Sequence, residues 1–117
     1  MIQLEIYLQG VRGLEPVTVD IVKCSKAIEE LKVELLKAQW MVQQGALNSS
    51  ETEILDSLSK LVGLSYLLSR RLGFDFSRLD RVLYKQMAEW QKDDYLYLES
   101  EWRDLSLLLG YLVPEDD

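Results

Sequence analysis

Two pairs of carboxylates stand among apolar residues in the first half of the chain. Glu30 and Glu34 occur in EELKVELL, and Glu53 and Asp56 occur in ETEILDSL. Residues three or four apart share one face of a helix, so each pair can present two carboxylates in the same direction. Carboxylate oxygens are the ligands that Mg²⁺ prefers, and a bound Mg²⁺ commonly contacts the phosphates of a substrate. The two pairs therefore predict a magnesium site, provided that their helices lie side by side.

The same acids also have ordinary structural explanations. Glu53 can be the reciprocal member of a capping box with Ser50, and acids in a first turn favour the helix dipole. Glu30 and Glu34 can be solvated and paired with Lys26 and Lys37 at helix spacing. Acid pairs of this kind are common on helices, so the spacing alone leaves both explanations open.

Four helices are expected to position these acids. Apolar residues recur every three or four positions in four stretches, which is the pattern of amphipathic helices. We expect them over about 18–44, 51–72, 77–91 and 95–112, with Gly45 and Gly73 ending the first two. Asn48, Ser49 and Ser50 offer caps for the second. Short connections favour an antiparallel four-helix bundle, so the predicted fold class is all-α.

The first helix carries two apolar stripes on different sides. The main stripe consists of Ile21, Cys24, Ile28, Leu31, Leu35, Ala38 and Val42, and the second of Val22, Val33, Leu36 and Trp40. A helix with two apolar sides must be covered twice, so it is central in a bundle or lies at a subunit interface. We therefore expect a homo-oligomer, a dimer or a tetramer. Trp40, Trp90 and Trp102 fall at core spacing, so we expect them in the core rather than stacked on a base.

Residues 1–17 are expected to form an N-terminal extended segment or arm. Ile2, Leu4, Ile6 and Leu8 alternate with other residues at the strand period, and Gly10, Gly13 and Pro16 follow. The helical bundle then spans residues 18–113. A length of 117 residues suits one domain, so residues 1–117 are predicted to form a single helical domain.

Composition limits the partners and the compartment. A net charge of −7 argues against a nucleic-acid polymer, because such binding needs many phosphate contacts. No apolar run reaches the roughly eighteen residues of a membrane span. The N-terminus does not resemble a signal peptide, and the lone Cys24 excludes an internal disulfide, so we expect a cytoplasmic protein. The chain has no histidine, which excludes imidazole-based metal sites and histidine-dependent triads.

The charges are unevenly distributed along the chain. Residues 70–85 carry five basic and two acidic side chains, whereas Lys92 and Arg103 face nine acids from Gln86 onward. A local basic patch in an acidic protein suits a small anion better than a polymer. The same arginines can equally form weak surface pairs with neighbouring acids.

The chain resembles the MazG-like proteins of the all-α nucleoside triphosphate pyrophosphohydrolase superfamily, over residues 20–112. The resemblance rests on AIEELKVELLKA, on EILDSLSKLVGLSYLLSRRLGFDFSRLDRVLYKQM and on EWRDLSLLLGYL. It is closest to a short MazG-like group found in Gram-positive bacteria. The resemblance implies a helical bundle that cleaves a nucleoside triphosphate to the monophosphate and pyrophosphate with Mg²⁺, using an ExxE pair and an ExxD pair.

The resemblance also assigns roles to residues. Glu53 and Asp56 match ExxD, but Glu30 and Glu34 are four apart, and Val33 stands where an acid is expected. It implies that these four acids hold Mg²⁺ and that one of them orients the attacking water. It further implies that Lys85 contacts phosphates; Arg81 is a further candidate, and the second basic residue expected soon after Lys85 is missing.

Two hypotheses follow. One is a Mg²⁺-dependent nucleoside triphosphate pyrophosphohydrolase with a partly degenerate acidic site. The alternative is a non-catalytic helical oligomer that acts as a protein-interaction or nucleotide-sensing module.

Overall fold

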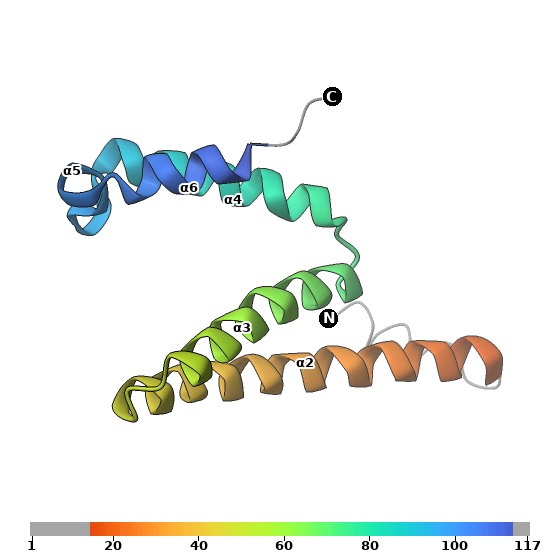
Figure 1. The fold of residues 1–117 in the computed structure, drawn as a ribbon. Helices are drawn as coiled ribbons and strands as arrows, with labels where there is room; N and C mark the ends of the chain where they lie inside the picture. The colour runs from red at the N-terminus through yellow and green to blue at the C-terminus, as the bar shows by residue number, and fades with distance from the viewer. Residues whose placement is uncertain (1–14, 114–117) are drawn as a thin grey trace. The chain divides into compact units, whose positions relative to one another are not determined.

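The computed structural model describes residues 15–113, and this part of the chain contains helices and loops but no strand. Its elements are α2 (Glu15–Leu47), α3 (Glu51–Arg71), α4 (Phe76–Asp93), the 3₁₀-helix η1 (Tyr95–Tyr97), α5 (Leu98–Trp102) and α6 (Asp104–Leu112) (Figure 1). The predicted all-α class is confirmed. The extended segment predicted over residues 1–17 lies almost wholly outside the described residues, and its last three residues begin α2.

Contacts divide the chain after Phe74 into two compact units. The first unit contains α2 and α3, and the second contains α4, η1, α5 and α6. The four-helix bundle and the single domain of residues 1–117 stay predictions. None of the helices between residues 15 and 113 combines the length and the apolarity that a membrane span requires.

The first unit is an antiparallel helical hairpin in which α2 packs along α3 (Figure 1). Ile28 and Ala38, both from the predicted main stripe, are buried, and so is Gly45. The predicted helix end at Gly45 is wrong, because α2 continues to Leu47. A Cβ atom at Gly45 would lie 3.0 Å from the backbone nitrogen of Ile54, so this glycine permits close helix packing.

Side-chain and backbone caps set the other ends of the hairpin. The helix α2 ends where Ser49 adopts a φ of 51° and the Ser50 N–H donates to the Gly45 carbonyl at 3.0 Å. Ser50 then caps α3, because its Oγ accepts the N–H of Glu53 at 3.2 Å. Gly73, with a φ of 99°, ends α3 as predicted.

The second unit packs α4 against α6 around a small core (Figure 1). Met87, Leu105 and Leu109 are buried there. The predicted continuous fourth helix is wrong, because η1, α5 and α6 replace it. Carboxylates six and seven residues earlier in the chain cap the first turns of α5 and α6. Asp94 accepts the Ser100 N–H at 3.0 Å, and Glu99 accepts the Ser106 N–H at 2.9 Å. These bonds satisfy backbone N–H groups at the beginnings of α5 and α6. The helix can therefore be interrupted within a stretch whose apolar pattern is continuous.

The second apolar stripe of α2, which was expected to be covered by another element or subunit, is exposed in the single chain. Leu36 and Trp40 expose 68% and 62% of their surfaces, and Val22 and Val33 about half. The expectation that the tryptophans are core residues is wrong for this chain. Trp102 exposes 63% and Trp90 38%, so none of the three tryptophans is buried.

Candidate functional site

The four predicted acids lie on one side of the α2–α3 hairpin. Three hollows follow one another along this side; Glu34 lines the first and second, and Trp40 and Met41 line the second and third. Glu30 belongs to the first hollow. Glu53 and Asp56 line the third, so the two acid pairs lie at opposite ends of one groove.

The two pairs are displaced from each other along the helix axes. Gly45 of α2 lies against Ile54 of α3, and this contact fixes the position of one helix along the other. Glu34 precedes Gly45 by eleven residues, and Asp56 follows Ile54 by two. Because the helices are antiparallel, the two acids are offset along the hairpin by about nine residues. At 1.5 Å per residue, this offset is roughly 14 Å for the nearest members of the two pairs. Ligands of one Mg²⁺ ion lie about 2 Å from it, so this offset is too large for a shared ion.

Two lysines occupy the interval between the acid pairs. Lys37 of α2 and Lys60 of α3 both line the middle hollow. Lys37 Nζ lies 3.1 Å from the Glu34 carboxylate, and Lys60 Nζ lies 3.8 Å from the Asp56 carboxylate. Each acid pair therefore has an ammonium group on the side that faces the other pair. This is the solvated, lysine-paired arrangement that the sequence left open for Glu34.

The α3 acid pair is also tied to the start of its helix. The Glu53 carboxylate accepts a hydrogen bond from Asn48 Nδ2 at 3.2 Å, while its own N–H donates to Ser50. Half of the expected capping box is thus present, and the Glu53 side chain turns to Asn48 instead of the Ser50 N–H. Ser57, which is fully buried, donates to the Glu53 carbonyl at 2.7 Å.

The α2 acid pair faces basic residues rather than the other acids. The hollow that holds Glu30 and Glu34 is also lined by Arg70 and Arg71, at the far end of α3, and has a volume of about 410 Å³. The antiparallel pairing explains this, because the level of Glu30 on α2 falls near the C-terminal end of α3. Local charge there is therefore mixed, not purely acidic.

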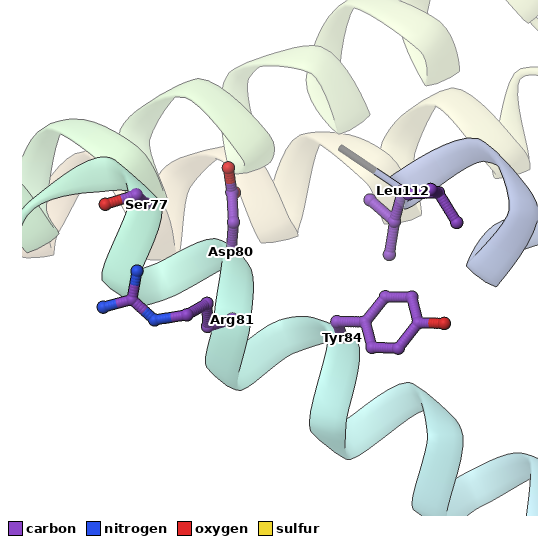
Figure 2. Close-up of a pocket in the computed structure, with 6 residues that line it drawn as sticks. Ser77, Asp80, Arg81, Tyr84 and Leu112 are labelled. Carbon is purple, nitrogen blue, oxygen red and sulfur yellow. The ribbon is translucent and has the colours of Figure 1, made fainter. Parts of the chain in front are cut away.

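The predicted phosphate contacts lie in the second unit. Arg81 lines a hollow of about 510 Å³ together with Ser77, Asp80 and Tyr84 of α4 (Figure 2). Leu112 of α6 closes it on the apolar side, and the Tyr84 ring points toward it (Figure 2). Lys85 is exposed on α4 and is not among the lining residues. The hollow can hold a small group with one anionic and one apolar part, because Arg81 supplies charge and Leu112 supplies apolar contact.

The donor set of one chain does not fit the magnesium site that the superfamily uses. Among residues 15–113 no three acids, cysteines or histidines come close enough together to hold a metal ion. The carboxylates of Glu34 and Asp56 each form an ion pair with a lysine. In this structure the four carboxylates of the hairpin therefore do not converge on one point.

Sequence reasoning missed a polar cluster in the second unit. Glu99 accepts hydrogen bonds from the Ser106 N–H, from the Ser106 hydroxyl and from Gln91 Nε2. The Ser106 bonds hold the pKa of the Glu99 carboxyl below its usual value, and Ser100 does the same for the pKa of Asp94. The available signal was the seven-residue spacing of Glu99 and Ser106, which places both on one side of the predicted fourth helix. The cluster stabilises the break between α5 and α6.

The family model of the MazG-like family matches residues 21–105 of the chain. This range extends across both units and includes all four acids, Arg81 and Lys85. Comparison with curated proteins gives no match, and comparison with solved structures gives none either. The family match covers most of the 117 residues, and the chain therefore belongs to the MazG-like family.

Proposed function

We propose that this chain acts as a non-catalytic helical oligomer, a protein-interaction module built on the MazG-like fold. The observation that carries the proposal is the roughly 14 Å offset between Glu34 and Asp56, with Lys37 and Lys60 between them. An ion needs its ligands within about 2 Å, and the two ammonium groups raise the cost of placing a cation there. Binding of a partner, unlike metal-dependent cleavage, does not require the four acids of this surface to come together.

The exposed apolar side chains support an oligomer. Few apolar side chains are fully buried among the described residues, and the buried ones include Ile28, Ala38 and Met87. Large ones stay exposed on every long helix, for example Leu36 on α2, Leu55 on α3 and Val82 on α4. Extensive exposed apolar surface usually marks an interaction site. A dimer or tetramer covers it.

A pyrophosphate-release assay tests the proposal. The wild-type chain and the Asp56→Ala variant are incubated with Mg²⁺ and a panel of nucleoside triphosphates. We expect both to stay at the rate of the protein-free control. Release by the wild type that Asp56→Ala abolishes would overturn the proposal, provided that Glu51→Gln, an exposed acid outside the groove, keeps the activity.

A second candidate is the Mg²⁺-dependent nucleoside triphosphate pyrophosphohydrolase. It is favoured by the ExxD spacing of Glu53 and Asp56, and by their position on the same side of the hairpin as the α2 acids. In this candidate Glu30 and Glu34 join them as Mg²⁺ ligands, with Arg81 and Lys85 on the phosphates. It requires a rearrangement or a second copy to bring the acid pairs together, and the same assay decides between the two.

A further inference from the structure

The short helix α6 covers only part of α4 in the second unit (Figure 1). Helix α4 has 18 residues and α6 has nine, so they are roughly 27 Å and 14 Å long at 1.5 Å per residue. The buried side chains between them, Met87, Leu105 and Leu109, lie toward the C-terminal end of α4. Where α6 ends, at Leu112, the other half of α4 borders a hollow of about 510 Å³. Sites for small molecules have volumes in this range.

One side of α4 and the end of α6 line this hollow. The lining residues of α4 recur every three or four positions, so they share one side of the helix. They are Ser77, Asp80, Arg81 and Tyr84. In Figure 2 the Ser77 hydroxyl and the Arg81 guanidinium lie at one end, and the Tyr84 ring lies beside Leu112 at the other. The hollow therefore has a polar end and an apolar end.

Arg81 is the charged group of this hollow that a ligand can engage. In the part of the chain that the structure describes, no hydrogen bond or ion pair holds its guanidinium. Arg78 and Asp80 of the same helix, by contrast, already take part in interactions. A guanidinium has a planar set of donors that fits a carboxylate through two parallel hydrogen bonds. An unpaired arginine beside an apolar surface therefore favours an anionic ligand with an apolar part.

The charge of the lining limits how much negative charge the ligand can have. Asp80 and Arg81 are the ionised side chains that line the hollow, and their formal charges cancel. A triphosphate would bring several negative charges against one guanidinium, and the Asp80 carboxylate would repel it. A ligand with a single negative charge is compensated by Arg81 alone. The hollow therefore suits a monocarboxylate better than a chain of phosphates.

We infer that this hollow binds a small apolar monocarboxylate. The carboxylate pairs with the Arg81 guanidinium, and Ser77 offers a hydroxyl donor at the same end. The apolar ring or chain of the ligand packs against the Tyr84 ring and Leu112. Such a site does not depend on the oligomer proposed above, because all of its lining residues belong to one unit. It also differs from the phosphate contact that Arg81 makes in the pyrophosphohydrolase candidate.

A titration of the full-length chain tests for this site. Phenylacetate is the probe, and the amide chemical shifts of the ¹⁵N-labelled protein report both the affinity and the place of binding. We expect saturable shifts at Ser77, Tyr84 and Leu112. Phenylacetamide has the same ring without the charge, and acetate has the charge without the ring. Each should bind at least about fivefold more weakly than phenylacetate, because it lacks one of the two contacts.

Two variants test whether Arg81 supplies the charge. Arg81→Gln should weaken phenylacetate binding at least about fivefold and remove the preference for phenylacetate over phenylacetamide. Lys92→Gln is the control, because Lys92 is an exposed cation of the same helix that does not line the hollow. It should bind phenylacetate like the wild type, which separates a specific contact from general attraction of an anion.

Several outcomes contradict a monocarboxylate site. Phenylacetate would then shift no amides, shift only amides outside the hollow, or bind Arg81→Gln as tightly as the wild type. Pyrophosphate that binds more tightly than phenylacetate, and loses this affinity in Arg81→Gln, would also overturn the site and would favour the pyrophosphohydrolase candidate. If Arg81→Gln loses its helical circular dichroism, the probes on the wild type decide instead. Equal affinities for phenylacetate and phenylacetamide would then contradict a carboxylate contact.

Discussion

Gly45 of α2 faces the backbone of Ile54 so closely that a Cβ atom added to Gly45 would lie 3.0 Å from the Ile54 nitrogen. It would also lie 3.1 Å from the Cγ1 atom of Ile54, so backbone and side chain both restrict the space. This contact fixes the level at which the two helices pair, and hence which acids lie opposite which residues. The offset between the acid pairs depends on it.

Replacing this glycine should therefore loosen the hairpin. We expect Gly45→Ala to lower the free energy of unfolding by about 1–2 kcal/mol, because the added methyl group pushes against backbone atoms. Gly63 of α3 is the matched control, since a Cβ there meets nothing within 4 Å. Gly63→Ala should raise the free energy of unfolding by up to about 1 kcal/mol through helix propensity. Urea unfolding measures both, and stabilisation by Gly45→Ala would contradict the close approach.

Local signals in the sequence predicted much of the fold, and tertiary contacts account for what they missed. The Ser50 cap and the Gly73 stop were predictable, because each acts on its own helix end. Gly45 was not, because its role depends on Ile54 across the hairpin. The break before α6 was not predictable either. It depends on Glu99 reaching the Ser106 N–H, a pairing that helical periodicity does not report.

The candidate site, like the fold, was only partly predictable from the sequence. A helical wheel places Glu30 with Glu34 and Glu53 with Asp56, and the structure keeps each pair together on one side. The level of one pair relative to the other depends on where the connection lies between α2 and α3. The spacing within each pair contains no information on that level. For this reason the sequence predicts which acids share a helix face, whereas the displacement along the hairpin depends on the contact between the two helices.

The Glu99 cluster should make the stability of the second unit depend on pH. Hydrogen bonds from Ser106 lower the pKa of Glu99 in the folded state, so the unfolded chain takes up a proton first as the pH falls. The contribution of Glu99 is then fully present above about pH 5 and decreases as the pH falls through and below the ordinary glutamate pKa of about 4.3. Thermal unfolding of the wild type and Glu99→Gln from pH 7 to pH 3 measures it. The difference between the two should shrink with acidification, and a constant difference would contradict this role.

The lysines between the acid pairs should contribute little to stability. Lys37 and Lys60 expose 65% and 51% of their side chains, and Glu34 and Asp56 expose 51% and 66%. Exposed ion pairs at helix spacing are worth only a few tenths of a kcal/mol. We therefore expect Lys37→Ala and Lys60→Ala each to change the free energy of unfolding by less than about 0.5 kcal/mol. A loss above about 1 kcal/mol in urea unfolding would mean that the oligomer buries these lysines.

Restoring the family spacing on α2 should not create an enzyme. Val33→Glu places an acid three residues after Glu30, as the ExxE pattern requires, at a position that is 52% exposed. The new pair still lies along the hairpin from Glu53 and Asp56, because the contact between Gly45 and Ile54 is unchanged. We expect pyrophosphate release from nucleoside triphosphates with Mg²⁺ to stay at background. Leu36→Glu is the control, since it adds the same charge to the same exposed stripe without restoring the spacing. The prediction is wrong if Val33→Glu releases pyrophosphate, Leu36→Glu does not, and adding Asp56→Ala abolishes the release. The residue at position 33, and not the offset between the helices, would then be what prevents cleavage.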